Sequence, residues 1–587
     1  MNFSGFHWRD RRMTASRSCS IIISRIAPNT KTWSSTLFWT TRTFRMAMLA
    51  IAALALAAAA APVARAQYNV LYNFGTKSGD PENPSNPGMI AQGRDGNMYS
   101  TTVNGGSNGL GSIFKITPAG DFSVIYHCDE THGYNLSSGL TLGTDGNFYG
   151  AAFAGGTAGF GTIFNITPTG TLSALYNFTG GSDGLYPAAP PIQGTDGNWY
   201  GTTQGNFSSY GTLYKLTTAG KLTVLYTFVG QQGSDQPKAP LIQGTDGNFY
   251  GTTALGGKNN QGMVFKITPS GELTVLYNFD STHGSASLSP LIQGSDGNFY
   301  GTTISGGSAG GGIAFKITPS GKLTVLANLG SGSGPAVPYA GLIQATDGLF
   351  YGNSYQGGTM GDGTVFRMSA KGQISDRYDF DITTGLRPEA TLLEHTNGVL
   401  YGDTYEGGSS VPACGNSGCG VFYSVNTGLG PFVSLVTSSG KVGKTIEILG
   451  QGFKGTTEVS FNGTAAKFTV VSETYMTAAV PPGATTGPVT VKTPGGALTS
   501  NKLFRVTPVI LSFNPTSGSV GTSVTIKGNS LTQTKGVTFG GVRATNFTVK
   551  SDADVMAIVP TGAKTGKIGI TTPGGTAFSR GIFTVTE

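Results

Sequence analysis

Carboxylate side chains that could hold a cation recur along this chain at a regular spacing. An Asp, or an Asn in the last instance, precedes Gly in seven places separated by steps of about fifty residues. These positions are Asp95, Asp145, Asp196, Asp246, Asp296, Asp347 and Asn397. Calcium needs about six or more oxygen ligands gathered together, whereas each of these residues stands alone in its repeat. Asp-Gly and Asn-Gly are also strong turn signals, so we predict structural turns here and no metal site.

A second group of metal-ligand residue types lies in one short segment, at His127, Cys128, Asp129 and His132. The sequence YHCDETHG that contains them recurs as YNFDSTHG at Tyr277–Gly284. Because the grouping is partly inherited from the repeat, we interpret it as a polar loop rather than a metal site. Cys128 takes the place of a Phe found in other repeats, which favours a buried apolar role.

Two further cysteines, Cys414 and Cys419, lie in the glycine-rich segment CGNSGC. In an exported protein they could close a small local disulfide, and the segment offers too few other ligands for a metal. The chain contains no nucleophile elbow, Walker loop, HExxH or paired CxxC motif. We therefore expect no metal and no cofactor, while an active site assembled from distant loops stays open.

The repeated Asp-Gly turns lie between short strand-like runs. The fourth copy reads PLIQ, FYGTT, MVFKIT and LTVLYNF between turn signals, which makes four strands in about fifty residues. One such sheet cannot bury both of its faces, so seven of them predict a β-propeller. The first strand-like segment after residues 1–66 is a fourth-strand sequence, Val70–Phe74, and the seventh copy lacks one. We therefore expect the N-terminal strand to close the ring, which leaves no open sheet edge between the first and last blades.

The repeated phrase GTDGNFYG…GG…GTVFKIT…G…VLYNF resembles the GloVer tandem repeats of exported bacterial "choice-of-anchor" proteins. The resemblance covers all seven copies, roughly residues 67–426. It implies an exported or surface-attached protein and implies no particular activity.

The C-terminal third has a second period, of about eighty residues. VGKTIEILGQGF (Val442–Phe453) recurs as VGTSVTIKGNSL (Val520–Leu531), and each unit closes with a PGG segment followed by a strand. Short alternating strands at this size predict two β-sandwiches. Both units resemble IPT/TIG domains, which implies an immunoglobulin-like fold and a role as spacer or adhesion module in bacterial surface proteins.

The N-terminal leader accounts for the positive charge of the chain. Residues 1–66 contribute +8 to the formal net charge of +7, so the chain from Gln67 on carries −1 and gives no support for a nucleic-acid partner. Residues 46–63 form an apolar, Ala-rich run before the A-x-A pattern Ala64-Arg65-Ala66, which predicts a secretory signal peptide. We expect a leader over 1–66, the propeller over 67–428, and sandwich domains over 429–506 and 507–587.

Strand parity assigns the loops to two faces of the ring. Strands alternate in direction within a blade, so the first and third turns share one face, and the second turn shares the other with the loops between blades. The repeats differ in the second set, which we call the variable-loop face, and variable loops on a rigid scaffold are typical of recognition. The candidate contact residues on this face are His132, Tyr134, Tyr186, His283, Tyr339 and Arg387.

These patterns favour a secreted or cell-surface, non-enzymatic binding or adhesion protein. Its partner would be a glycan, a surface polymer or another protein, and we expect a monomer with no membrane span after signal cleavage. The alternative is a propeller-based glycosidase or lyase acting on polysaccharides. Such enzymes need convergent carboxylates, and the first strands of the repeats carry almost none, Glu394 being the exception. A third reading is an architectural surface protein without a ligand.

Overall fold

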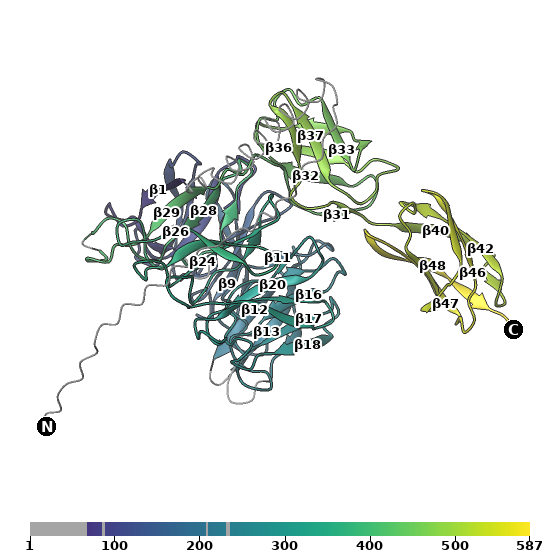
Figure 1. Ribbon diagram of the computed structural model, residues 1–587, viewed down its shortest axis with the longest axis horizontal. Coiled ribbons are helices and arrows are strands. Elements are labelled where there is room, and N and C mark those ends of the chain that lie inside the picture. The colour runs from purple at the N-terminus through teal and green to yellow at the C-terminus, as the bar shows by residue number, and fades with distance from the viewer. Residues whose placement is uncertain (1–66, 85–88, 207–208, 230–234, 412) are drawn as a thin grey trace, which may run out of the picture. The chain divides into compact units, whose positions relative to one another are not determined.

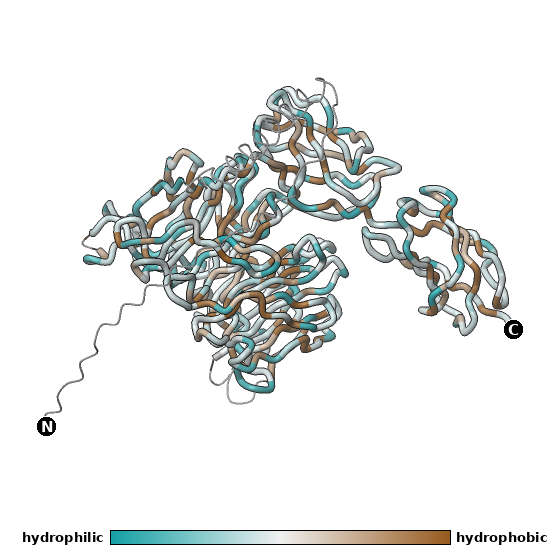
Figure 2. Tube along the Cα trace, in the orientation of Figure 1, coloured by the Kyte–Doolittle hydropathy of each residue, from teal (hydrophilic) through white to brown (hydrophobic). Residues whose placement is uncertain are grey.

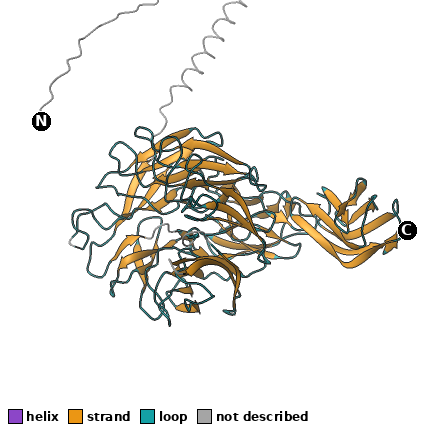
Figure 3. Cartoon of the chain, turned by 90° about the horizontal axis from the view of Figure 1, so that it is seen from below, coloured by secondary structure: helices purple, strands orange, loops and turns teal. Residues whose placement is uncertain are grey.

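The computed structural model describes residues 67–84, 89–206, 209–229, 235–411 and 413–587 of the chain (Figure 1). The predicted signal peptide at 46–63 and the rest of the leader lie outside these ranges. The described residues form strands, turns and loops, as Figure 3 shows in orange and teal. No helix within these ranges is long and apolar enough to cross a membrane.

Seven small antiparallel sheets make up residues 67–426, and we label the four repeated strands of each sheet A to D in order across it. In blade 1, strand A is β3 (Ala91–Gln92), and β2 (Pro81–Pro84) is a fifth strand that also pairs with strand B, β4 (Met98–Gly105). Blades 1 to 3 contain β2 (Pro81–Pro84), β3 (Ala91–Gln92), β4 (Met98–Gly105), β5 (Ser112–Ile116) and β6 (Phe122–His127); β7 (Thr141–Leu142), β8 (Phe148–Ala152), β9 (Thr162–Ile166) and β10 (Leu172–Asn177); β11 (Ile192–Gln193), β12 (Trp199–Asn206), β13 (Ser209–Leu216) and β14 (Leu222–Thr227). Blades 4 to 6 contain β15 (Ile242–Gln243), β16 (Phe249–Thr252), β17 (Met263–Ile267) and β18 (Leu273–Asn278); β19 (Ile292–Gln293), β20 (Phe299–Thr303), β21 (Ile313–Ile317) and β22 (Leu323–Asn328); β23 (Ile343–Gln344), β24 (Phe350–Ser354), β25 (Thr364–Met368) and β26 (Ile374–Asp379).

The seventh blade combines the two ends of the repeat region. It contains β27 (Leu393–Glu394), β28 (Leu400–Asp403) and β29 (Val421–Asn426), and β1 (Gln67–Asn73) as its fourth strand. β1 pairs antiparallel with β29, from Gln67 opposite Asn426 to Asn73 opposite Val421. This register confirms the predicted ring of seven blades closed by the N-terminal strand.

Aromatic side chains join neighbouring blades at five of the seven interfaces, from blades 1 and 2 to blades 5 and 6. The Tyr of one strand B lies against the aromatic residue that begins strand B of the following blade, with ring centroids 3.7–4.2 Å apart. These pairs are Tyr99–Phe148, Tyr149–Trp199, Tyr200–Phe249, Tyr250–Phe299 and Tyr300–Phe350. Each such pair contributes about 0.5–1.5 kcal/mol beyond its buried area. In Figure 2, brown hydrophobic segments alternate with pale and teal ones along the described chain.

Two β-sandwiches follow the propeller, as predicted, and each has its own apolar core. The first contains β30 (Ser434–Leu435), β31 (Ser439–Gly440), β32 (Thr445–Leu449), β33 (Glu458–Phe461), β34 (Thr464–Ala465), β35 (Phe468–Val470), β36 (Tyr475–Ala479), β37 (Val489–Thr493), β38 (Gly496–Thr499) and β39 (Arg505–Val506). The second contains β40 (Val509–Asn514), β41 (Ser517–Gly518), β42 (Ser523–Asn529), β43 (Gly536–Phe539), β44 (Val542–Arg543), β45 (Phe547–Ser551), β46 (Asp554–Ile558), β47 (Gly566–Thr572) and β48 (Gly575–Val585). Their sheets pair in the orders β30-β32-β36-β35 and β34-β33-β37-β38, then β40-β42-β46-β45 and β41-β48-β47-β43-β44.

Candidate functional site

The repeated Asp residues are engaged inside their own turns. Asp246 Oδ1 accepts the backbone N–H of Asn248 at 3.1 Å, and its Oδ2 accepts the Asn248 amide at 2.7 Å and the Tyr250 hydroxyl at 2.8 Å. The same three bonds occur at Asp95, Asp145, Asp196 and Asp296, and two of them at Asp347. In the seventh blade Asn397 accepts the Val399 N–H and donates to the Tyr401 hydroxyl. These contacts tie each turn to strand B and support a structural role.

A polar bridge connects the turns of neighbouring blades on the same face, which we call the turn face. The side-chain oxygen of a Gln or Glu in strand A accepts the backbone N–H just before the Asp or Asn of the preceding blade, at 2.8–3.1 Å. Gln92 of blade 1 makes this bond to Thr396 of blade 7. It thereby spans the interface between the last and first blades, which we call the closing seam of the ring. Glu394, the one acid in a strand A, makes it to Thr346. Its carboxylate therefore belongs to the bridge series.

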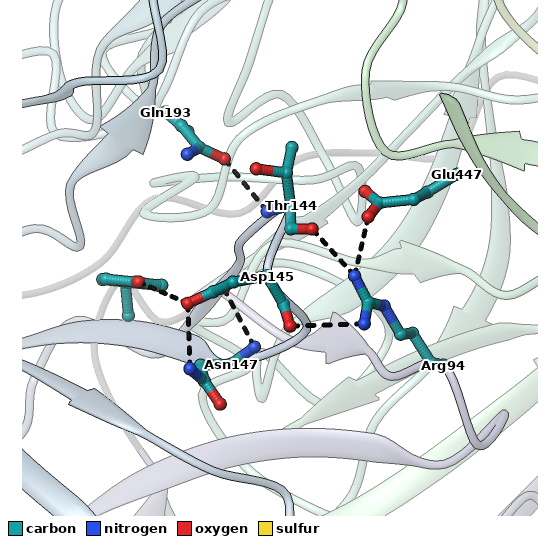
Figure 4. Close-up of polar contacts among 7 residues, drawn as sticks. Arg94, Thr144, Asp145, Asn147, Gln193 and Glu447 are labelled. Atoms are coloured by element: carbon teal, nitrogen blue, oxygen red, sulfur yellow. Dashed lines mark hydrogen bonds and ion pairs between the residues drawn. The ribbon is translucent and has the colours of Figure 1, made fainter. Parts of the chain in front are cut away.

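The interface between blades 1 and 2 lacks the bridging Gln, because strand A of blade 2 has Leu142 at that position. Arg94 of blade 1 connects the two blades instead (Figure 4). The Arg94 guanidinium donates to the carbonyls of Thr144 and Asp145, at 2.8 and 3.2 Å. It also pairs with Glu447 of β32, in the first sandwich, at 2.7 Å. Burial raises the pKa of Glu447 by more than Arg94 lowers it. Arg94 thus links two blades to the first sandwich.

Further bonds join the first sandwich to the turn face. Gln451 donates to the Thr396 hydroxyl at 2.9 Å, and Thr474 donates to the Arg94 carbonyl at 2.8 Å. Arg505 donates to the Thr245 carbonyl, in blade 4, at 2.6 Å. The turn face therefore contacts the first sandwich at the turns of blades 1, 4 and 7.

The loops between blades share one backbone conformation although their sequences differ. Each contains one non-glycine residue with φ between +45° and +59°. These residues are Asn83, Asn135, Tyr186, Gln236, Ala286, Val337 and Arg387. In six blades the carbonyl of this residue accepts the N–H at the end of strand B, at 3.0–3.2 Å, as Tyr186 does from Gln204. A β-branched residue such as Val337 rarely adopts this conformation, so the surrounding structure imposes it. The variable-loop face is a fixed frame that presents different side chains.

A cavity of about 270 Å³ opens within this frame. Seven residues line it: Ser137, Phe153, Ala188, Gln204, Lys238, Leu288 and Tyr339. Five of them lie two positions after the residue with positive φ, and the other two, Phe153 and Gln204, donate their N–H to it. Equivalent positions of several blades therefore converge on one cavity, which must lie where the blades meet around the ring axis.

The cavity lining contains one cationic side chain, Lys238, and the ring of Tyr339 near a buried acid. Lys238 is half-buried and burial lowers its pKa. Tyr339 has a raised pKa, caused first by burial and then by the nearby charge of Glu389, and its ring lies 4.9 Å from that of Tyr355. Glu389 holds the corresponding position of the next loop, two residues after Arg387, and is 4% exposed. The lining thus combines one ammonium group, two aromatic rings, an amide and the hydroxyl groups of Ser137 and Tyr339.

The structure gives the six predicted contact residues different surroundings. Tyr339 lines the cavity. Tyr186 stacks on the lining residue Phe153, with centroids 4.8 Å apart. Arg387 pairs with Glu406 at 2.8 Å and lies over the Tyr355 ring. Of these three, Tyr339 lines the cavity, Tyr186 contacts a lining residue, and Arg387 contacts Tyr355, whose ring lies beside that of Tyr339.

The other three predicted contacts lie outside the cavity lining, and both histidines pair with an acid of their own loop. His132 Nδ1 lies 3.0 Å from the carboxylate of Asp129, and His283 Nδ1 lies 2.9 Å from that of Asp280. The backbone of Tyr134 pairs with Ala154. None of the three lines the cavity among the residues described.

Sequence reasoning missed Lys238, Phe153 and Gln204. The sequence did contain a signal for Lys238. Five of the loops carry a Pro directly after the residue with positive φ, in NPS, YPA, QPK, VPY and RPE. In three of these loops the residue after the Pro lines the cavity, as Ala188, Lys238 and Tyr339. Aligning the loops on this Pro would have identified Lys238 as the counterpart of Tyr339.

The cysteines lie apart from the cavity lining. Cys414 and Cys419 form a disulfide, and Cys128 is a buried free thiol. Among the described residues, the only group of three metal-ligand types is Glu82 with Cys414 and Cys419. The disulfide already uses both sulfur atoms of this group.

Comparisons with known families identify the repeats and the last domain. The model of the Gloeobacter/Verrucomicrobia repeat matches residues 61–244 and 236–470. The IPT/TIG domain model matches residues 508–585, so one such domain is found where the sequence analysis expected two. The first sandwich has the expected sandwich architecture, but the repeat model is the one that extends into it.

Solved structures with similar folds include both enzymes and binding proteins. Virginiamycin B lyase from Staphylococcus aureus is 16% identical, with 62% of this chain and 99% of that chain covered and a TM-score of 0.42. A fungal alcohol oxidase is 15% identical, with coverage of 76% and 100% and a TM-score of 0.43. A surface glycan-binding protein from Prevotella bryantii is 16% identical, with coverage of 26% and 41% and a TM-score of 0.21. At these scores the likenesses carry no conclusion about ligand or activity. Among curated proteins, none matches this chain.

Proposed function

The chain belongs to the Gloeobacter/Verrucomicrobia repeat family, and we propose that it is an exported or cell-surface protein that binds a glycan, without catalysis, in the cavity of the variable-loop face. The observation that carries the proposal is the convergence of one repeated position from several blades on a single cavity. The propeller, over 67–428, is the recognition scaffold. The sandwiches over 429–506 and 507–587 act as spacers.

The lining suits part of a carbohydrate. Small-molecule sites have volumes of about 300–1,000 Å³, so a cavity of about 270 Å³ fits a terminal sugar or a short segment rather than a long chain. Phe153 and Tyr339 offer flat apolar surfaces, and Gln204 and Ser137 offer hydrogen bonds to hydroxyl groups. Rigid backbone around the cavity lowers the entropic cost of ordering these groups on binding.

The composition of the lining also favours binding over hydrolysis. Glycosidases generally use a pair of carboxyl groups that flank the scissile bond. The seven lining residues include no carboxyl group. Glu389 holds the equivalent position of the loop before blade 7, and its charge raises the pKa of Tyr339, Tyr355 and Tyr405.

A glycan array followed by calorimetry on the best glycan tests the proposal. Tyr339→Ala and Phe153→Ala should each weaken binding about tenfold, since loss of an aromatic contact worth about 1.4 kcal/mol corresponds to that factor. Met360→Ala is the matched control, because Met360 is 69% exposed in a loop of the same face and outside the cavity. Unchanged affinity in the double variant of Tyr339 and Phe153 would refute the assignment of the site.

Export is tested separately. Mass spectrometry of the extracellular or surface fraction should find a mature N-terminus at Gln67, directly after the Ala64-Arg65-Ala66 pattern. Recovery of the protein only from the cytoplasm with residues 1–66 attached would contradict the proposed location.

A further inference from the structure

We propose that the glycan bound in this cavity is acidic, and that Lys238 holds its carboxylate while Tyr339 and Phe153 contact the sugar ring. This inference rests on the proposed function and narrows the class of ligand. The juxtaposition that carries it is a half-buried cation, with no partner among the described residues, beside two aromatic rings in one cavity.

Lys238 is half-buried and has no counter-ion within the described ranges. The ion pairs among the described residues use Arg94, His132, Lys215, His283, Arg387, Lys492 and Lys527. No side-chain hydrogen bond of Lys238 is found in this part of the chain either, although the residue lines the cavity. Partial burial without compensation disfavours the ammonium form and lowers its pKa. An anionic ligand group would supply the missing charge and hydrogen bonds.

The acids close to Lys238 along the chain and around the ring are occupied elsewhere. Asp235 is 5% exposed and its side chain points to the next loop, where it accepts the N–H of Gly257. Glu406 pairs with Arg387 at 2.8 Å. The charge of Glu389 raises the pKa of three tyrosines, Tyr339, Tyr355 and Tyr405. The positive charge at Lys238 is therefore available to the cavity.

The remaining lining residues select the rest of the ligand. Tyr339 and Phe153 come from different blades and provide flat faces for the C–H groups of a pyranose ring. Gln204 can both donate and accept, and Ser137 adds a hydroxyl, so neutral hydroxyl groups of the sugar find partners. A carboxylate next to a pyranose ring is the chemistry of a uronic acid residue.

The test compares acidic oligosaccharides with the same oligosaccharides after reduction of their carboxyl groups. Oligogalacturonates and oligoglucuronates, each with its reduced partner, are titrated into the full mature chain by calorimetry. We expect at least one acidic member to bind at least tenfold more tightly than its reduced partner. Lys238→Gln should abolish this preference, and Lys238→Arg should retain part of it. Lys221→Gln is the matched control, because Lys221 is exposed at a turn on the opposite face and the change of charge is the same.

The outcomes separate the inference from the proposed function. Equal affinity for acidic and reduced members, or a preference that survives in Lys238→Gln, overturns the inference and leaves a glycan-binding cavity in place if Tyr339→Ala still weakens binding. Absence of binding to every glycan on an array, acidic or neutral, overturns both. Accumulation of unsaturated products, read by ultraviolet absorbance during the titration, overturns the non-catalytic role and supports a lyase.

Discussion

Replacing Asp403 with asparagine should stabilise the propeller, and the gain should increase as the pH rises. Asp403 ends strand B of blade 7 and is 1% exposed. In most other blades this position donates to a backbone carbonyl of the next loop, as Thr101 does to Leu136 at 2.8 Å and Asn353 does to Ala390 at 2.9 Å. Asp403 can donate only while it is protonated, and its Oδ2 has no hydrogen-bond partner among the described residues, so the charged carboxylate is disfavoured here.

The magnitude follows from proton linkage. Burial raises the pKa of Asp403 well above 3.8, so between these two values the folded protein holds a proton that the unfolded chain has released. The free energy of unfolding of the wild type must then fall by about 1.4 kcal/mol for each pH unit in that window. Stability from this group is fully present below pH 3.8 and is lost as the pH rises through the folded pKa. The amide of the Asp403→Asn variant does not titrate, so the difference between variant and wild type should widen with the same slope.

Urea unfolding followed by tryptophan fluorescence measures this difference between about pH 4 and pH 8. Trp199 is the single Trp after the leader and lies fully buried in blade 3, so the signal reports on the propeller. Asn353→Asp provides the matched control, because it places an acid at the same position of blade 6 and should introduce the same loss with rising pH. A difference between Asp403→Asn and wild type that does not change with pH would refute the reasoning.

Three further changes test the seams of the ring. His395 is fully buried and burial lowers its pKa, so stability should fall below about pH 6.5 by about 1.4 kcal/mol per unit, and pH-dependent urea titrations of His395→Gln should lack this fall. Gln92→Leu removes the acceptor of the buried Thr396 N–H at the closing seam, and thermal unfolding should show a loss of about 1–3 kcal/mol; an unchanged midpoint would contradict the bridge. Arg94→Thr should cost about 1–3 kcal/mol and raise the pKa of Glu447 further, with partial recovery when Glu447→Gln is added in a double-mutant cycle; additive effects would show that the pair is not coupled.

Much of the fold was predictable from local signals. Strand length, alternation and Asp-Gly turns act between residues close in sequence, so the four strands of each repeat could be identified directly. Val70–Phe74 is a fourth-strand sequence without the first three strands of a repeat, and the seventh copy lacks a fourth strand. Together these two features predicted the pairing of β1 with β29. Strand parity also predicted a face of variable loops, and Tyr339 on that face lines the cavity.

The site itself was only partly predictable, because its residues lie about fifty positions apart and no local pattern joins them. His132, His283 and Tyr134 are as prominent in the sequence as Tyr339, yet the two histidines pair with acids of their own loops, and the backbone of Tyr134 pairs with a loop of the next blade. Lys238 looks like an ordinary loop lysine until its counterparts in the other blades are aligned.

The sequence by itself determined the repeat, the number of blades and the closure of the ring, since these depend on periodicity and turn chemistry within each copy. Tertiary structure decided which single position of each loop faces the ring axis, and so which side chains share a cavity. It also decided how far each ionisable group is withdrawn from water, fully at Asp403 and partly at Lys238. Burial and convergence arise only when blades pack around a common axis, and neither quantity is a property of any one segment.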